Sequence, residues 1–265
     1  MSDSIKSGIY VDISNADYHA HPAISNSYLS RLDKCPAAAK VPQESTAAMT
    51  FGSAAHCHVL EGAEEFNKRY AVAPVCDKRT TAGKAIFAEF QAQNGGKEIL
   101  SVADANTILA ISKAVKAHPF AAKLLAEGKA EQSVFWQDDS TGMQMKCRPD
   151  WLTNCGVVVD LKTTTDASEH AFTRSVTGYG YHRQAALYLD GLNAIGEQYD
   201  TFVFIAVEKE EPYRVEVYTL DADFVHAGRC DYRRLLYVEE SCQLMTSWPA
   251  FQNSGITEII KPAWI

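Results

Sequence analysis

Residues 156–165 read GVVVDLKTTT, and they decide the interpretation of the whole chain. Three consecutive valines, 157–159, predict a buried strand. A carboxylate and an ammonium follow at Asp160 and Lys162, although a buried strand disfavours unpaired charge. Side chains two residues apart on a strand point to the same face, so these two lie together while Leu161 points to the opposite face. Both charged groups therefore need partners from elsewhere in the chain.

A second carboxylate stands ten residues upstream, at Asp150 in the stretch CRPDWL. A hairpin through residues 154–156, Asn-Cys-Gly, would bring Asp150 and Asp160 to one edge of a sheet. Two close carboxylates repel each other unless a cation lies between them, and Mg²⁺ typically takes one or two carboxylates and several waters. Lys162 could then orient or help to deprotonate a water, or stabilise negative charge on a phosphoryl group. The pattern predicts metal-assisted phosphodiester hydrolysis; the alternative is a simple exposed Asp–Lys salt bridge.

The order of predicted elements indicates an α/β fold with a central mixed β-sheet flanked by helices. We predict one domain over residues 1–265: a mainly helical part (1–130), an α/β core (131–245) and a tail (246–265). Helices are expected at residues 53–60, at 84–127 with a break at Pro119, at 181–196 and at 221–245. Strands are expected in QSVFWQDD, MQMKCRPD, GVVVDLKT, YDTFVFIAVEK and YRVEVYTLD.

Composition excludes some classes of protein. The 265 residues carry a net charge of −8, which argues against a generally basic surface but leaves room for a local basic groove. Apolar runs of about 18 residues, as a transmembrane helix needs, are absent from the sequence. The first residues, MSDSIKSGIYVDIS, lack the apolar core of a signal peptide, so we expect a cytoplasmic protein with no membrane partner. Seven scattered cysteines without a Cys-x-x-Cys pair indicate reduced thiols.

Four motifs together resemble one family of nucleases. The pair RPDWL and VVVDLKT is similar to the P-D…(D/E)-x-K active site of the restriction-endonuclease-like superfamily. The stretch FGSAAHCHVLE resembles the G-x-x-x-H motif of its RecB-like branch, and YHRQAALYLDG resembles the Q-x-x-x-Y motif of that branch. ISNSYLSRLDKCP resembles the opening helix of these domains, and the order of the four suits the RecE-type exonucleases related to exodeoxyribonuclease VIII, from phages and prophages. The resemblance covers residues 9–245.

The resemblance implies a set of metal-binding and catalytic residues. His56, Asp150 and Asp160 would bind Mg²⁺, for which Mn²⁺ would substitute, and the carbonyl of Leu161 would be a further ligand. Lys162 would be the catalytic lysine.

Further residues are implied around this centre. Glu131 resembles an acidic residue that assists the site in related exonucleases, and Gln184 and Tyr188 lie four apart on one helix face, towards the site. Taken alone, His56, Gln184 and Tyr188 could equally be packing residues, and Glu131 a surface residue. The DNA contacts that we expect are Arg148, Thr163, Thr164, Arg183, Lys78 and Arg79. No iron–sulfur cluster is expected, because the C-terminal part offers only Cys230 and Cys242.

For a chain of this type the resemblance implies a Mg²⁺-dependent exonuclease that acts on double-stranded DNA ends. It would digest the 5′-ended strand and leave 3′ single-stranded tails for homologous recombination by strand annealing. It also implies a homotetrameric ring and a RecT-type annealing protein as a partner. The alternatives are a single-strand or structure-specific nuclease of the same fold and a DNA-binding protein without catalysis.

Overall fold

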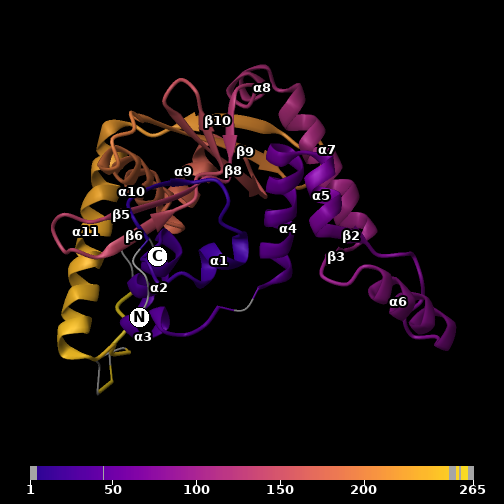
Figure 1. Cartoon of the computed structure of the whole chain (residues 1–265), viewed down its shortest axis with the longest axis horizontal. Coiled ribbons are helices and arrows are strands. Elements are labelled where there is room, and N and C mark those ends of the chain that lie inside the picture. Colours follow the sequence, from indigo (N-terminus) through magenta and orange to yellow (C-terminus); the bar gives the residue numbers. More distant parts are fainter. Residues whose placement is uncertain (1–4, 44, 251–254, 257, 262–265) are drawn as a thin grey trace.

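A five-stranded mixed sheet forms the centre of the molecule (Figure 1). The structure, a computed structural model, describes residues 5–43, 45–250, 255–256 and 258–261. The strand order of the sheet is β10-β9-β8-β7-β4. Strands β8 and β9 are parallel, and the other neighbours are antiparallel. The strands span Gly128–Ala130 (β4), Trp151–Thr153 (β7), Val157–Thr164 (β8), Thr201–Glu208 (β9) and Val215–Thr219 (β10).

Two smaller sheets stand beside the central one. A three-stranded antiparallel sheet has the order β1-β5-β6, and its strands span Gly8–Tyr10 (β1), Ser133–Gln137 (β5) and Gln144–Cys147 (β6). A two-stranded parallel sheet joins Tyr70–Val72 (β2) and Glu98–Leu100 (β3). The strands QSVFWQDD and MQMKCRPD therefore form, but they lie in a separate sheet from β8.

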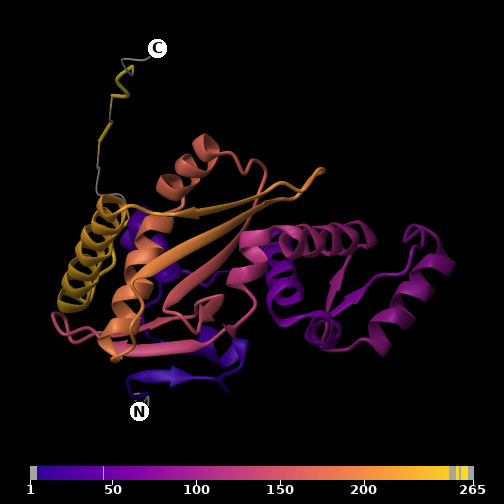
Figure 2. The same ribbon diagram turned by 90° about the horizontal axis from the view of Figure 1, so that it is seen from above.

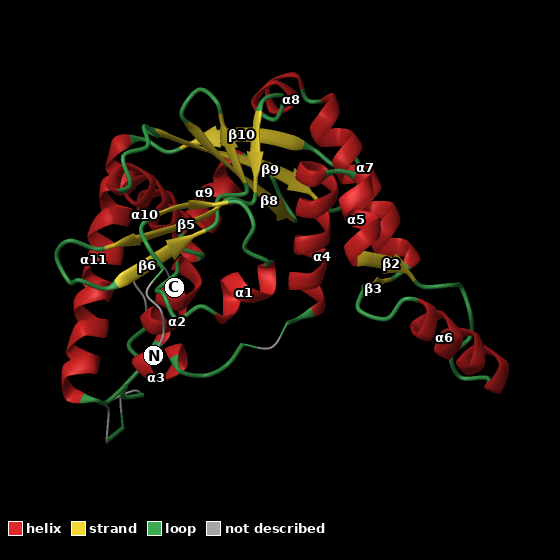
Figure 3. Cartoon of the chain, in the orientation of Figure 1, coloured by secondary structure: helices red, strands yellow, loops and turns green. Residues whose placement is uncertain are grey.

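Helices cover the sheets and extend to one side (Figure 3). The first group spans Asn15–Ala20 (α1), Asn26–Lys34 (α2), Pro36–Ala39 (α3), Ala47–His56 (α4), the π-helical turn Cys57–Glu61 (η1) and Ala63–Arg69 (α5). The second group spans Thr81–Gln93 (α6), Val102–Ala117 (α7), Pro119–Leu124 (α8), Glu169–Gly178 (α9), Tyr181–Ala194 (α10) and Ala222–Met245 (α11). Several begin at a side-chain cap, for example Ser25 before α2 and Asp221 before α11.

Successive side chains of β8 and β9 point to opposite faces of the sheet, and each face packs against its own apolar layer. On one face, Val158 packs with Phe202, Phe204 and residues of α9 and α10. On the other face, Val159 and Leu161 pack with residues of α7 and α8. Asp160 is two residues from Val158, so its side chain points to the α10 face, as the period of two predicts. The charged pair of the sequence thus lies between the sheet and α10.

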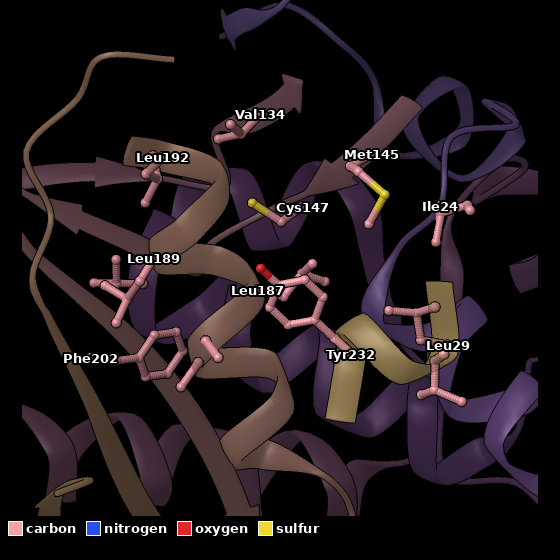
Figure 4. Close-up of a cluster of buried hydrophobic side chains, with 14 of the residues drawn as sticks. Ile24, Leu29, Val134, Met145, Cys147, Leu187, Leu189, Leu192, Phe202 and Tyr232 are labelled. Atoms are coloured by element: carbon pink, nitrogen blue, oxygen red, sulfur yellow. The ribbon is translucent and has the colours of Figure 1, made fainter. Parts of the chain in front are cut away.

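The larger core connects α10 to the second sheet and to the N-terminal helices. Figure 4 shows Leu187, Leu189 and Leu192 of α10 between Phe202 on one side and the strands that carry Val134 and Cys147 on the other. Tyr232 of α11 and Leu29 of α2 close this cluster. The core therefore fixes α10, the helix that carries Gln184, against the central sheet.

One part of the predicted helical region forms a projecting arm instead. Residues 84–127 were expected to be helical throughout, apart from the break at Pro119. In the structure α6 ends at Gln93, the chain turns, and β3 precedes α7, while Pro119 opens α8 as expected. Glycines at 95 and 96 interrupt the helix because glycine is a poor helix former. Figures 1 and 2 show α6 at the far end of the molecule, away from the central sheet.

Candidate active site

The hairpin β7–β8 brings the two aspartates together as the sequence predicted. The register pairs Trp151 with Val159, so Asp150, just before β7, lies beside Asp160. Gly156 turns the chain with a φ of 81°, a left-handed conformation that favours glycine. The backbone N–H of Leu161 donates a hydrogen bond to Asp150 Oδ2 at 2.8 Å. This contact fixes the Asp150 carboxylate, and the expected role of the Leu161 carbonyl stays a prediction.

His56 reaches this carboxylate from the helical part of the chain. It is the last residue of α4, and its Nδ1 lies 3.3 Å from Asp150 Oδ2. The helix continues as the π-helical turn η1, a distortion that often occurs at functional sites. Burial alone would lower the pKa of His56, but Asp150 and Glu131 raise it to about 9. The same imidazole keeps the pKa of Asp150 below its usual range despite burial.

Glu131 completes a group of three potential ligands. One ligand atom each of His56, Glu131 and Asp150 can be chosen so that all three lie within 4.8 Å of one another. Glu131 has a φ of 51°, which is costly for a residue with a side chain, and its N–H donates to the Asp150 carbonyl at 3.1 Å. Burial and the neighbouring Asp150 raise the pKa of Glu131 to about 8. A strained backbone that presents an acid to two other ligands points to a functional position.

Asp160, Lys162 and Gln184 form the second half of the site. The Lys162 ammonium lies 2.7 Å from Asp160 Oδ2 and donates to Gln184 Oε1 at 3.0 Å. Gln184 Nε2 in turn donates to Asp160 Oδ1 at 2.5 Å. Burial raises the pKa of Asp160 to about 6, although the Lys162 ammonium offsets part of this rise. Burial would lower the pKa of Lys162, but Asp160 and Asp150 raise it above its ordinary value.

The donor atoms at the β7–β8 hairpin fit a hard divalent cation. Asp160 lies outside the group of three because its carboxylate contacts Lys162 and Gln184. Its Oδ2 is buried and forms an ion pair with the Lys162 ammonium. Within the described residues, no group donates a hydrogen bond of normal geometry to this oxygen. Together with His56, Glu131 and Asp150, this provides three carboxylates and one imidazole, a donor set that suits Mg²⁺ or Mn²⁺. The structure thus brings two of the predicted metal ligands, His56 and Asp150, together with Glu131, while Asp160 lies beside Asp150 on the neighbouring strand and contacts Lys162 and Gln184.

Two tyrosines of α10 border the site. Tyr188 is half-buried, its ring makes an edge contact with Phe202, and burial raises its pKa, helped by nearby negative charges that include Asp160. The ring of Tyr181 lies 4.5 Å from the Lys162 ammonium. Sequence reasoning missed Tyr181, although its position three residues before Gln184 places both on one helix face.

The expected DNA contacts at residues 163 and 164 and at residues 78 and 79 lie in two different places. Thr163 and Thr164 end β8 beside the site, and the hydroxyl of Thr164 donates to the Asp166 carbonyl at 3.1 Å. Lys78 and Arg79 lie on the α6 arm, where Lys78 stacks on a phenylalanine ring and Arg79 pairs with Asp77. Of these four residues, only the two threonines lie on the strand that carries Asp160 and Lys162.

Two of the arginines that we expected to contact DNA have structural contacts instead. Arg148 donates to Ser133 Oγ and to the Ile13 carbonyl, so it ties the N-terminal segment to β5. Arg183 is 3% exposed and pairs with Asp231 at 2.8 Å and with Asp33 at 3.3 Å. A guanidinium that is buried among its own partners cannot reach a phosphate, so we no longer assign Arg183 to the DNA surface.

Arg183→Met should lower the free energy of unfolding by about 2 kcal/mol, because it removes a buried guanidinium that donates to Ser30, Asp33 and Asp231, while Arg234 still pairs with both aspartates. Urea denaturation would measure the change, with Arg174→Met, at an exposed position of α9, as the matched control. The control should stay within about 0.5 kcal/mol of the wild-type protein. Unchanged stability combined with weaker DNA binding in Arg183→Met would restore the original interpretation of this residue.

The site has the pattern of a PD-(D/E)xK nuclease: a P-D…D-x-K pair on a hairpin, a histidine from a preceding helix and a glutamine from the following helix. This class of enzymes is metal-dependent. The family comparison agrees with the site. Residues 25–262 match the model of the family described as "PDDEXK-like domain of unknown function (DUF3799)". The chain belongs to this family, and the predicted superfamily and fold class are thereby confirmed. Among curated proteins, none matches the chain.

Two solved structures are similar to the chain at low sequence identity. A protein from Eubacterium rectale, described as "Putative exonuclease", is 15% identical, with a TM-score of 0.57 over 95% of this chain and 97% of that one. SSO0001 is also 15% identical, with a TM-score of 0.30 over 72% of this chain and 87% of that one. The first comparison shows a common fold; the second is too distant to carry an argument.

None of the helices in the described part of the chain is long and apolar enough to cross a membrane.

Proposed function

We propose that this nuclease is a Mg²⁺-dependent exonuclease that acts on the ends of double-stranded DNA. The observation that carries the proposal is the gathering of His56, Glu131 and Asp150 at the β7–β8 hairpin, with Asp160 and the Lys162 ammonium beside them on β8. Action on ends is supported by the shared fold with the Eubacterium rectale protein, which is described as an exonuclease.

The residues of the chain have distinct roles in this proposal. Bound Mg²⁺ would stabilise charge on the phosphoryl oxygens and lower the pKa of a bound water. Lys162 donates to two acceptors, as an ammonium does, and so is placed to stabilise negative charge that develops on the phosphoryl group. Gln184 is a positioning residue, because it contacts both Lys162 and Asp160. His56 orients the Asp150 carboxylate through its 3.3 Å contact.

Digestion of end-labelled DNA tests the proposal. Linear duplex with Mg²⁺ should release labelled nucleotides from an end, and a closed circular duplex of the same sequence should stay intact. Cutting of the circle would instead indicate an endonuclease. Failure to degrade any DNA, while the protein still binds duplex, would favour the DNA-binding alternative.

The finer features rest on the resemblance to RecE-type exonucleases alone. We propose 5′-to-3′ digestion that leaves 3′ tails for recombination by strand annealing, a homotetrameric ring and a RecT-type partner. Separate labels at the 5′ and 3′ ends would distinguish the polarity. Light scattering of the purified protein would measure the mass of the assembly, and a monomer would contradict the ring.

A further inference from the structure

The exposed ring of Tyr179 contacts Tyr181, the tyrosine that lies against the lysine of the site. Tyr181 faces the Lys162 ammonium at 4.5 Å, and its ring contacts the ring of Tyr179, with centroids 5.7 Å apart and planes tilted by 31°. Tyr181 also packs on Phe172 and Phe204 of the core. Tyr179 is not part of that core. It is 69% exposed, and its ring contacts the ring of Tyr181.

The backbone fixes this ring at the connection between two helices. Tyr179 follows α9, whose last residue is Gly178, and Gly180 turns the chain with a φ of 70° directly before α10. Because α10 is anchored in the core and Gln184 contacts Lys162, the connection has a fixed position relative to the site. A single exposed aromatic residue is ordinary on a protein surface, so exposure alone has no functional meaning. The contact of Tyr179 with Tyr181, whose ring lies against the Lys162 ammonium, gives it one.

We propose that Tyr179 is a base-stacking residue for the strand that enters the site. This inference rests on the proposed function, because it takes the substrate to be DNA whose scissile phosphate meets Lys162. A strand with a phosphate at Lys162 passes Tyr181 and then presents a neighbouring base to the exposed ring of Tyr179. Every base has a π-face, so an aromatic ring binds the strand without selecting its sequence. Tyr181 below it is a positioning residue, which holds both Tyr179 and the ammonium of Lys162.

Steady-state digestion of linear duplex tests the proposal. Tyr179→Ala should raise KM between about fivefold and 150-fold, the range expected for the loss of one stacked base, and leave kcat nearly unchanged. Tyr179→Phe should restore the wild-type KM, because the ring and not the hydroxyl makes the contact. The matched control is Tyr237→Ala, which removes another exposed tyrosine, on α11, and should have no effect.

A substrate change identifies the stacked base. Duplexes with one abasic nucleotide at each of the terminal positions should show a raised KM for the wild-type enzyme at one position, and no further rise there for Tyr179→Ala. Equal penalties in both proteins at every position, or an unchanged KM for Tyr179→Ala, would overturn the stacking role while the nuclease assignment stands. A changed oligomeric mass of Tyr179→Ala with normal DNA affinity would also overturn it and would make this ring a subunit contact. A wild-type protein that degrades no DNA would contradict the proposed function itself.

Discussion

Lys162→Met should lower the rate of nucleotide release from linear duplex by about 10²- to 10³-fold, the loss expected when a transition-state charge loses its donor. Methionine keeps most of the length of the lysine stem and removes the ammonium. The side chain of Lys162 is only 17% exposed and lies between Asp160, Gln184 and the Tyr181 ring. Because no solvent cation can take this buried position, the loss of charge stabilisation should appear in kcat more than in KM. Initial rates with Mg²⁺ over a range of DNA concentrations would measure both constants.

The control for this variant is Lys113→Met, which removes an exposed ammonium from α7. It should digest DNA at the wild-type rate. Thermal unfolding of both variants would show whether the fold persists, and Gln184→Ala would be an independent probe of the same contact. A Lys162→Met protein that is folded, binds DNA and digests it at the wild-type rate would contradict the role of this lysine.

The hairpin of the site could be predicted because its signals are local. The valines before Asp160 indicate a buried strand, the period of two places Lys162 on the same face, and Gly156 marks the turn. The structure follows this pattern, with Leu161 fully buried on the opposite face. His56 and Gln184 could be placed only through the resemblance, because nothing local in an apolar helix shows that its polar residue faces a distant strand.

The features that the sequence did not reveal depend on distant partners or on short elements. Arg183 was predicted to be a surface cation, but its partners come from α2 and α11. A single sequence does not show which residues from distant helices form an ion pair. The strand β7 has three residues, too few for a periodic pattern. The helix α9 buries only two side chains, Phe172 and Val176, and one pair four residues apart does not by itself establish a helical period. The left-handed conformation of Glu131 likewise occurs together with a contact to a distant residue, the hydrogen bond from its N–H to the Asp150 carbonyl.

Asp150→Asn should abolish measurable Mn²⁺ binding and reduce DNA digestion by about 10³-fold or more, because it removes one negative charge from the centre of the ligand group. The amide oxygen can still accept the hydrogen bond from the Leu161 N–H, so the hairpin should keep its shape. His56 would lose the carboxylate that raises its pKa, and it would titrate nearer its ordinary value. Isothermal titration calorimetry with Mn²⁺ measures the binding directly, without any dependence on catalysis.

Asp139→Asn is the matched control, since it removes an exposed carboxylate from the β5–β6 turn. Its Mn²⁺ affinity should equal that of the wild-type protein. Removal of divalent ions from the wild-type enzyme should reproduce the inactivity of Asp150→Asn, and added Mg²⁺ should restore only the wild type. Unchanged Mn²⁺ affinity in a folded Asp150→Asn protein would mean that the cation binds elsewhere. The cluster of His56, Glu131 and Asp150 would then be an ion-pair network, because an imidazolium between two acids is also a stable arrangement without a metal.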